Sequence, residues 1–236
     1  MTAPVAAPDL SSQLTLGLAL GTQASFANAV DSKKPVQAML ERQWSGAGSA
    51  VFLHGEPASG KSWLLYASVA SLPASDAACL DLAELKQAGN ARMLDDLDGF
   101  GLLCLDNVDL VAGLEDYEEH LFHLVNRYRD AEKHLVLAAR QSPRALDIRL
   151  RDLASRLNAM QVIRLPRPDD TELLWLMTFK LKERGLEFDA ALPQYLLLRL
   201  PRDMHSVDAA LEQIDRAAWT YKRSLTLPFV RKVLGW

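Results

Sequence analysis

The chain has 236 residues, of which 49% are hydrophobic and 24% charged, and its formal net charge is −4. These values are typical of a globular protein and exclude a low-complexity chain. Proteins that bind nucleic acid through bulk charge are basic, so that class is excluded, although local basic patches are not. Two cysteines are too few for a disulfide framework and favour a reducing, cytoplasmic environment.

The first thirty residues carry one charged side chain, Asp9, and include the short apolar run LTLGLAL. A secretory signal needs a positively charged start, but the first basic residue is Lys33. No stretch reaches the roughly 20 apolar residues that cross a bilayer. We therefore expect residues 1–24 to be a flexible tail and expect no membrane partner.

Short apolar runs alternate with amphipathic helices from residue 36 onward. Such runs favour a parallel sheet covered by helices on both faces, which is an α/β fold. The expected helices cover residues 36–44, a segment that starts at Ser62, and residues 117–132. The expected strands are Ala50–His54, Cys79–Leu82, Leu102–Asp106, Leu135–Ala139 and Val162–Leu165.

The chain changes character at LPRPDD, where two prolines interrupt it and Asp169 or Asp170 can cap a helix. The remainder is expected to be helical. The pattern therefore predicts an α/β base over residues 25–165 and a small all-helical lid over residues 166–236. The expected lid helices cover residues 171–184, 190–200, 203–223 and 228–234.

A complete G-x-x-x-x-G-K-[ST] motif follows the first predicted strand and opens a helix, which is the context that this phosphate-binding motif requires. Its backbone N–H groups can surround phosphate, Lys61 can reach the β- and γ-phosphates, and Ser62 can hold Mg²⁺. A fortuitous glycine turn is the disfavoured alternative. The residues expected to bind ATP or ADP here are Gly55, Glu56, Pro57, Ala58, Ser59, Gly60, Lys61, Ser62 and Trp63.

Asp106 ends an apolar strand, where its carboxylate can hold Mg²⁺ together with Ser62. The next residue is Asn107, at a position where hydrolysing proteins of this architecture often carry an acid. An amide cannot accept a proton from the attacking water. We therefore expect weak intrinsic turnover.

The order of the phosphate loop, LLCLDN, LVLAAR, RDLASRL and LPRDMHS resembles that of the AAA+ ATPases of the DnaA group. Within this group the resemblance is strongest to the Hda proteins, which are small DnaA homologues, and it spans nearly the whole chain. It implies a three-layer αβα AAA+ domain with a five-stranded parallel sheet, followed by a helical lid. The chain ends after the lid helices, where DnaA continues into a DNA-binding domain.

The resemblance also assigns roles to two arginines. Arg156, in RDLASRL, matches the arginine finger that reaches the nucleotide of a neighbouring subunit, and Arg202 matches the lid residue that contacts the chain's own nucleotide. The polar sensor residue that relatives carry near Ala139 is absent. The resemblance implies an ADP-bound form that stimulates hydrolysis of ATP held by DnaA.

The tail segment QLTLGL resembles the Q-L-x-L-x-L clamp-binding peptide of Hda proteins. The residues that this resemblance assigns to clamp binding are Gln13, Leu14, Leu16 and Leu18. The implied partners are DnaA and the sliding clamp, the β subunit of DNA polymerase III, with DNA reached indirectly through the clamp. The implied role is negative regulation of replication initiation. The resemblance further implies a cytoplasmic protein that associates with the nucleoid through the clamp, and it is compatible with assembly into a homo-oligomer.

Two other functions stay open at this stage. An autonomous ATPase that remodels a partner on DNA would turn over ATP alone, and an adaptor that recruits factors would not need Arg156.

A metal site at His120 and His123 is disfavoured, because no further ligand cluster is near in the sequence. Arg149 and Arg151 belong to a basic region that either is solvated or faces an anionic partner.

Overall fold

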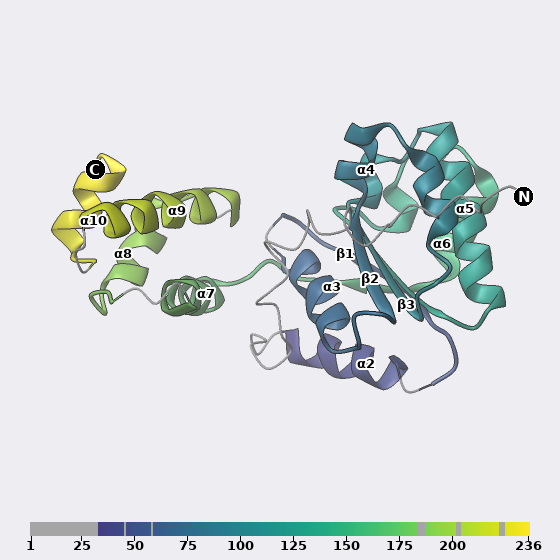
Figure 1. Cartoon of the computed structure of the whole chain (residues 1–236), viewed down its shortest axis with the longest axis horizontal. Helices are drawn as coiled ribbons and strands as arrows, with labels where there is room; N and C mark the ends of the chain where they lie inside the picture. Colours follow the sequence, from purple (N-terminus) through teal and green to yellow (C-terminus); the bar gives the residue numbers. More distant parts are fainter. Residues whose placement is uncertain (1–32, 45, 58, 184–186, 202–203, 222–224) are drawn as a thin grey trace, which may run out of the picture. The chain divides into compact units, whose positions relative to one another are not determined.

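The computed structural model describes residues 33–236 except 45, 58, 184–186, 202–203 and 222–224. The chain forms two compact units (Figure 1). One unit, called the base below, comprises residues 33–55 and 61–164. The other comprises residues 165–236, called the lid below, together with the short segment 56–60.

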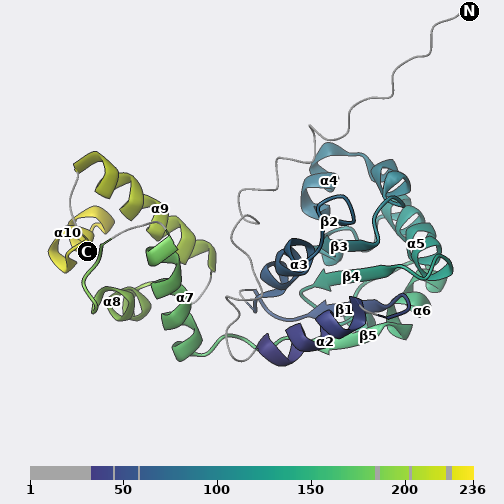
Figure 2. The same cartoon turned by 60° about the horizontal axis from the view of Figure 1, so that its bottom comes forward.

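The base is built on a five-stranded parallel sheet with the order β2-β3-β4-β1-β5 (Figure 2). The sheet that the sequence predicts is therefore confirmed, with the bounds of β1 and β3 as expected and the ends of the other strands within two residues of the expected ones. The chain order alone does not give this spatial order, in which β1 lies between β4 and β5. The strands are β1 (Ala50–His54), β2 (Ala77–Asp81), β3 (Leu102–Asp106), β4 (His134–Ala139) and β5 (Gln161–Arg164).

Both faces of the central strands are apolar because helices cover both of them. Phe52, Leu105 and Leu137 alternate with their neighbours and face the core shared with α5 and α6. The intervening Leu53 and Cys104 are also fully buried. Helices α2 and α3 lie on the opposite face from α5 and α6 (Figures 1 and 2). All five residues of β3 are buried, which places the end of this strand inside the base.

The helices of the base include two that the sequence analysis did not predict, α4 and α6. The predicted second strand was wrong at its end, because Leu82 begins α4. Asp81 caps this helix: its Oδ1 accepts the Ala83 N–H at 2.8 Å. The helices are α2 (Lys34–Trp44), α3 (Lys61–Ala70), α4 (Leu82–Ala88), α5 (Glu115–Asp130) and α6 (Arg151–Ala159), with single 3₁₀ segments η5 (Ala91–Asp96), η6 (Val108–Leu110) and η7 (Pro143–Ala145).

The lid contains the four predicted helices, whose observed ends lie within two residues of the expected ones. Asp169 caps the first of them by accepting the Glu172 N–H at 2.8 Å. Leu181, Leu196 and Leu211, from three different helices, meet in one core. Among the described residues, no helix has both the length and the apolar character needed to cross a membrane. The lid helices are α7 (Asp170–Glu183), α8 (Leu192–Arg199), α9 (Met204–Tyr221) and α10 (Leu227–Leu234).

Candidate functional site

The phosphate-binding motif lies where β1 ends and α3 begins, at the carboxyl edge of the sheet. Gly60 has a φ of 88°, a left-handed conformation that glycine adopts without steric strain. The Gly55 N–H donates to the carbonyl oxygen of Ala139 at 3.3 Å, which ties the start of the loop to the end of β4. The strand, loop and helix therefore occur in the order that the motif requires.

Lys61 begins α3 and is only 8% exposed. Its Nζ donates to the carbonyl oxygen of Gly55 at 2.7 Å, so the side chain folds back over the loop. Burial lowers the pKa of the ammonium group, while the charges of Asp106 and Asp109 oppose this shift. A cation that has lost part of its hydration gains from contact with an anion, and the sequence motif of this loop predicts that the anion is phosphate.

Asp106 is the last residue of β3 and is 4% exposed. The Ser62 hydroxyl and the Asn107 N–H both donate to its carboxylate, the latter at 2.8 Å. Burial raises the pKa of Asp106 despite these hydrogen bonds, and the charge of Asp81, its register partner on β2, adds to the increase. The structure therefore brings Ser62 and Asp106 together, as the sequence analysis expected.

Asn107 directly follows this acid and has a φ of 59°, in the left-handed region. This backbone turns its side chain toward β2, where Nδ2 donates to Asp81 Oδ1 at 2.8 Å. The same carboxylate oxygen caps α4. The amide of Asn107 is thus held as a donor by a fixed partner, and it offers no proton-accepting group to a water molecule.

Arg140 and Asp109 are two site residues that sequence reasoning missed. Arg140 directly follows Ala139, and its N–H donates to Asp109 Oδ1 at 3.0 Å, while its guanidinium Nε lies 3.9 Å from Oδ2. Both charges act on the pKa of Lys61, which Asp109 raises and Arg140 lowers. A basic residue directly after an apolar strand was the available signal, because strand ends meet at one edge of a parallel sheet.

Arg156 lies on α6, away from this cluster in the sequence. Leu153 and Leu157 are fully buried against the base core, so they fix the side of the helix that faces inward. Arg156 is exposed. Arg156 therefore lies on the exposed side of α6.

The other predicted site residues divide into those at the loop and those outside the described residues. Glu56 and Pro57 are exposed, and Trp63 is half-buried in the first turn of α3. Among the described residues, no group of three or more His, Cys, Asp and Glu could hold a metal ion without other ligands. The predicted residues outside the described part are Ala58, Arg202, Gln13, Leu14, Leu16 and Leu18.

Two family models match separate parts of the chain. Residues 170–234 match the model described as the Hda lid domain. Residues 81–163 match the bacterial DnaA ATPase domain. The second match begins after the phosphate-binding loop, so that the assignment of the loop depends on its own motif and geometry.

Solved structures share the fold at low sequence identity. Domain III of DnaA from Thermotoga maritima aligns with a TM-score of 0.76 and 16% identity, over 91% of this chain and 96% of that chain. DnaA bound to AMPPCP and single-stranded DNA aligns with a TM-score of 0.64 and 21% identity, over 82% of this chain and 65% of that chain. This chain thus spans about two thirds of that DnaA chain. A variant of RuvB from Thermotoga maritima aligns with a TM-score of 0.67 and 17% identity, over 92% of this chain and 73% of the RuvB chain.

We predict that Asp106→Asn stabilises the nucleotide-free protein at neutral pH. Because burial raises the pKa of Asp106, the folded protein holds this proton more tightly than the unfolded chain does, and ionisation at pH 7 lowers the free energy of unfolding. The neutral amide should raise the Tm by about 2–4 °C, equivalent to about 1 kcal/mol.

Thermal unfolding followed by circular dichroism measures this difference. The gain should shrink as the pH falls through the raised pKa of Asp106, and it should vanish below about 3.9, where the carboxyl is protonated in both states. Asp147→Asn, at an exposed position, is the matched control and should leave the Tm unchanged. A lower Tm for Asp106→Asn at pH 7, with the control unchanged, would contradict the destabilising role of the buried charge.

Proposed function

We propose that this chain, which belongs to the DnaA-related AAA+ proteins and carries a lid domain of the Hda family, regulates replication initiation by stimulating hydrolysis of DnaA-bound ATP. It would act while bound to the DNA-loaded sliding clamp and would supply Arg156 to the nucleotide site of DnaA. The observation that carries the proposal lies in the loop site. Lys61, folded over the phosphate loop, occurs there together with an amide, Asn107, at the position where we expect a hydrolysing protein to carry an acid.

The base would bind ATP or ADP together with Mg²⁺. Lys61 supplies the positive charge, and α3 directs its N-terminus toward the loop, an arrangement that favours phosphate. Ser62 and Asp106 would hold Mg²⁺, since a hydroxyl and a carboxylate already lie within hydrogen-bond distance and this ion takes oxygen ligands. When bound, Mg²⁺ neutralises phosphate charge. The unfavourable burial of the Asp106 carboxylate supports a cation there.

The same site is poorly equipped to hydrolyse its own nucleotide. The Asn107 amide is engaged by Asp81 and cannot accept a proton. Ala139, at the end of β4, carries no polar group to contact a γ-phosphate or a water. These two residues favour a bound nucleotide that persists, and they disfavour an autonomous remodelling ATPase.

Hydrolysis would instead occur at the site of DnaA. An arginine supplied by a second molecule stabilises the charge that develops on the transferring phosphoryl group. Arg156 is suited to this task because Leu153 and Leu157 anchor one side of α6 while the guanidinium is exposed. Bound nucleotide in this chain would then maintain the structure of the base rather than be consumed.

We predict that Arg156→Ala removes the stimulation and leaves nucleotide binding intact. Arginine fingers contribute about 10³–10⁵-fold to the rate, so the loss should bring DnaA close to its unstimulated rate. The measurement follows hydrolysis of labelled ATP prebound to DnaA, with this chain and DNA-loaded clamp added. Arg216→Ala is the control, because Arg216 lies on α9 with a side chain 77% exposed. Normal stimulation by Arg156→Ala would overturn the role assigned to Arg156.

We also propose that the tail binds the clamp as an extended peptide. Successive side chains of an extended segment point to opposite sides, so Leu14, Leu16 and Leu18 could enter one apolar groove while the Gln13 amide fixes the register by hydrogen bonds. Leucines at alternate positions and an uncharged neighbourhood support this proposal. Gly17 adds conformational entropy that must be lost on binding.

We predict that replacing Gln13, Leu14 and Leu16 together by Ala abolishes binding to the clamp. Thr15→Ala is the matched control, since residue 15 would point away from the groove. Its affinity should stay within a factor of about two, which corresponds to about 0.4 kcal/mol. Calorimetric titration of the clamp with each variant measures the effect. If the triple variant bound as tightly as the unaltered chain, the tail would not be the clamp-binding element.

A further inference from the structure

Glu118 is a buried carboxylate that has no part in the site described above. It lies in the first turn of α5 and is 2% exposed. Three backbone N–H groups donate to it: Gly113 to Oε1 at 2.6 Å, Arg149 to both oxygens at 3.1 and 3.0 Å, and Leu150 to Oε2 at 2.7 Å. These four contacts use the accepting capacity of both carboxylate oxygens.

The carboxylate links the starts of two helices. Gly113 precedes α5, whereas Arg149 and Leu150 directly precede α6. Leu150 is the N-cap of α6 and has no side chain that can accept a hydrogen bond from the helix. A glutamate of a capping box accepts the N–H of the N-cap residue of its own helix. Glu118 accepts the corresponding N–H from a neighbouring helix and so ties α6 to α5.

The electrostatic setting explains why a charge is tolerated there. The N-terminal ends of α5 and α6 both carry partial positive charge, and a carboxylate at a helix N-terminus is stabilised by it. Backbone N–H groups then satisfy the carboxylate without a cationic side chain. A neutral side chain of the same shape would lose both contributions.

We propose that Glu118 is the positioning residue for Arg156. Buried Leu153 and Leu157 determine which side of α6 faces the core, and Glu118 fixes where the helix starts. Arg156 lies six residues after Leu150, about 9 Å along the helix axis at 1.5 Å per residue. A shift at the start of this short helix therefore moves the guanidinium directly. The proposal rests on the role of Arg156 in the proposed function.

A positioning role differs from general structural support in what it changes. A displaced guanidinium lowers the maximal stimulated rate, because misplacement by about 1 Å can reduce a rate about 100-fold. It leaves the concentration of this chain that gives half-maximal stimulation unchanged, as well as its nucleotide affinity. Loss of folded protein would instead raise the concentration required and reduce the nucleotide bound.

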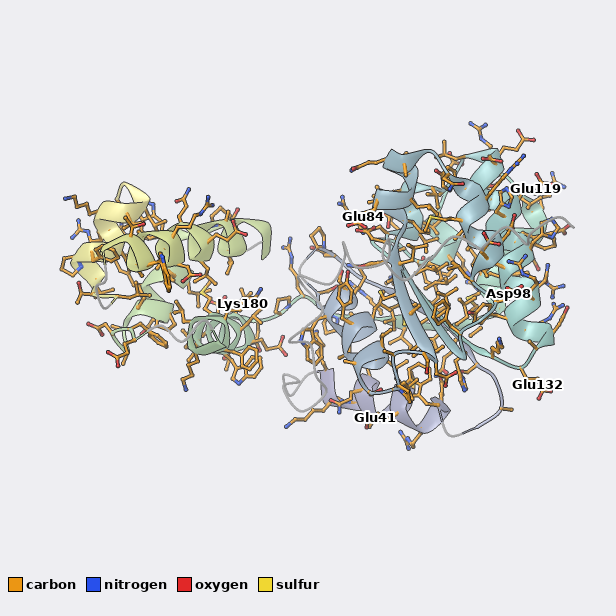
Figure 3. All side chains as sticks on the ribbon, viewed as in Figure 1. Glu41, Glu84, Asp98, Glu119, Glu132 and Lys180 are labelled. Atoms are coloured by element: carbon orange, nitrogen blue, oxygen red, sulfur yellow. The ribbon has the colours of Figure 1, made fainter. Side chains whose placement is uncertain are left out.

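Glu118→Gln tests the proposal with Glu119→Gln as the matched control. The glutamine retains the shape but turns an NH₂ group toward N–H donors, which leaves donors without acceptors. Glu119 is the next residue, exposed on the outer side of α5 (Figure 3). We expect Glu118→Gln to lower the maximal stimulated rate about 10-fold to 100-fold at an unchanged half-saturating concentration. Glu119→Gln should match the unaltered chain.

Amide hydrogen exchange on the full chain provides a second readout that needs no DnaA. In Glu118→Gln, the amides of Arg149 and Leu150 and those of α6 should exchange at least about 10-fold faster, while protection of β1 and β3 stays unchanged. If Glu118→Gln does not fold, Glu118→Asp takes its place. This variant keeps the charge but is too short to reach both loops, and the same loss is expected.

The outcomes separate the two proposals. If the unaltered chain stimulates, Arg156→Ala does not, and Glu118→Gln stimulates fully, then the positioning role is wrong and the proposed function stands. If the unaltered chain does not stimulate, the proposed function fails. Exchange rates then decide whether Glu118 fixes α6, and unchanged protection of residues 149–159 would overturn the inference.

Discussion

Two opposite charges, Lys61 and Asp106, are buried at one edge of the sheet, and the candidate site is built around them. Lys61 folds over the phosphate loop to Gly55 at 2.7 Å, and Asp106 ends a fully buried strand. The two charges lie close enough to act on each other's pKa, and we infer that a nucleotide with its cation would add further compensation, with phosphate near the lysine and the cation near the carboxylate. The parallel sheet makes this possible because it brings the ends of β1, β3 and β4 to one edge.

The same edge also limits the chemistry. Asn107 is held by Asp81, and Ala139 adds no polar group, so under the proposed function the site would bind nucleotide without activating water for its hydrolysis. A protein of this kind would act on a nucleotide held elsewhere. Its net charge of −4 does not favour direct binding to DNA, and a clamp that already encircles DNA would remove that requirement.

Much of the fold could be predicted because its signals are local. Apolar runs gave the five strands, and the glycine-lysine pattern gave the loop between β1 and α3. Helices α4 and α6 were missed because each has only two large apolar side chains, Leu82 and Leu85 in α4 and Leu153 and Leu157 in α6, which are too few to establish a helical periodicity. The contacts of Glu118 with Arg149 and of Asp109 with Arg140 each join residues 31 positions apart. No local pattern shows such contacts; the fold brings these residues together.

The fate of ATP on the isolated chain tests the central claim most directly. Labelled ATP and Mg²⁺ should bind stoichiometrically to the purified protein and remain unhydrolysed over the time in which DnaA, in the presence of this chain and loaded clamp, hydrolyses its own ATP. Lys61→Ala, which removes the loop cation, should abolish the binding. Steady turnover by the isolated chain that Lys61→Ala removes would contradict the account, because it would show that Asn107 and Ala139 do not prevent hydrolysis.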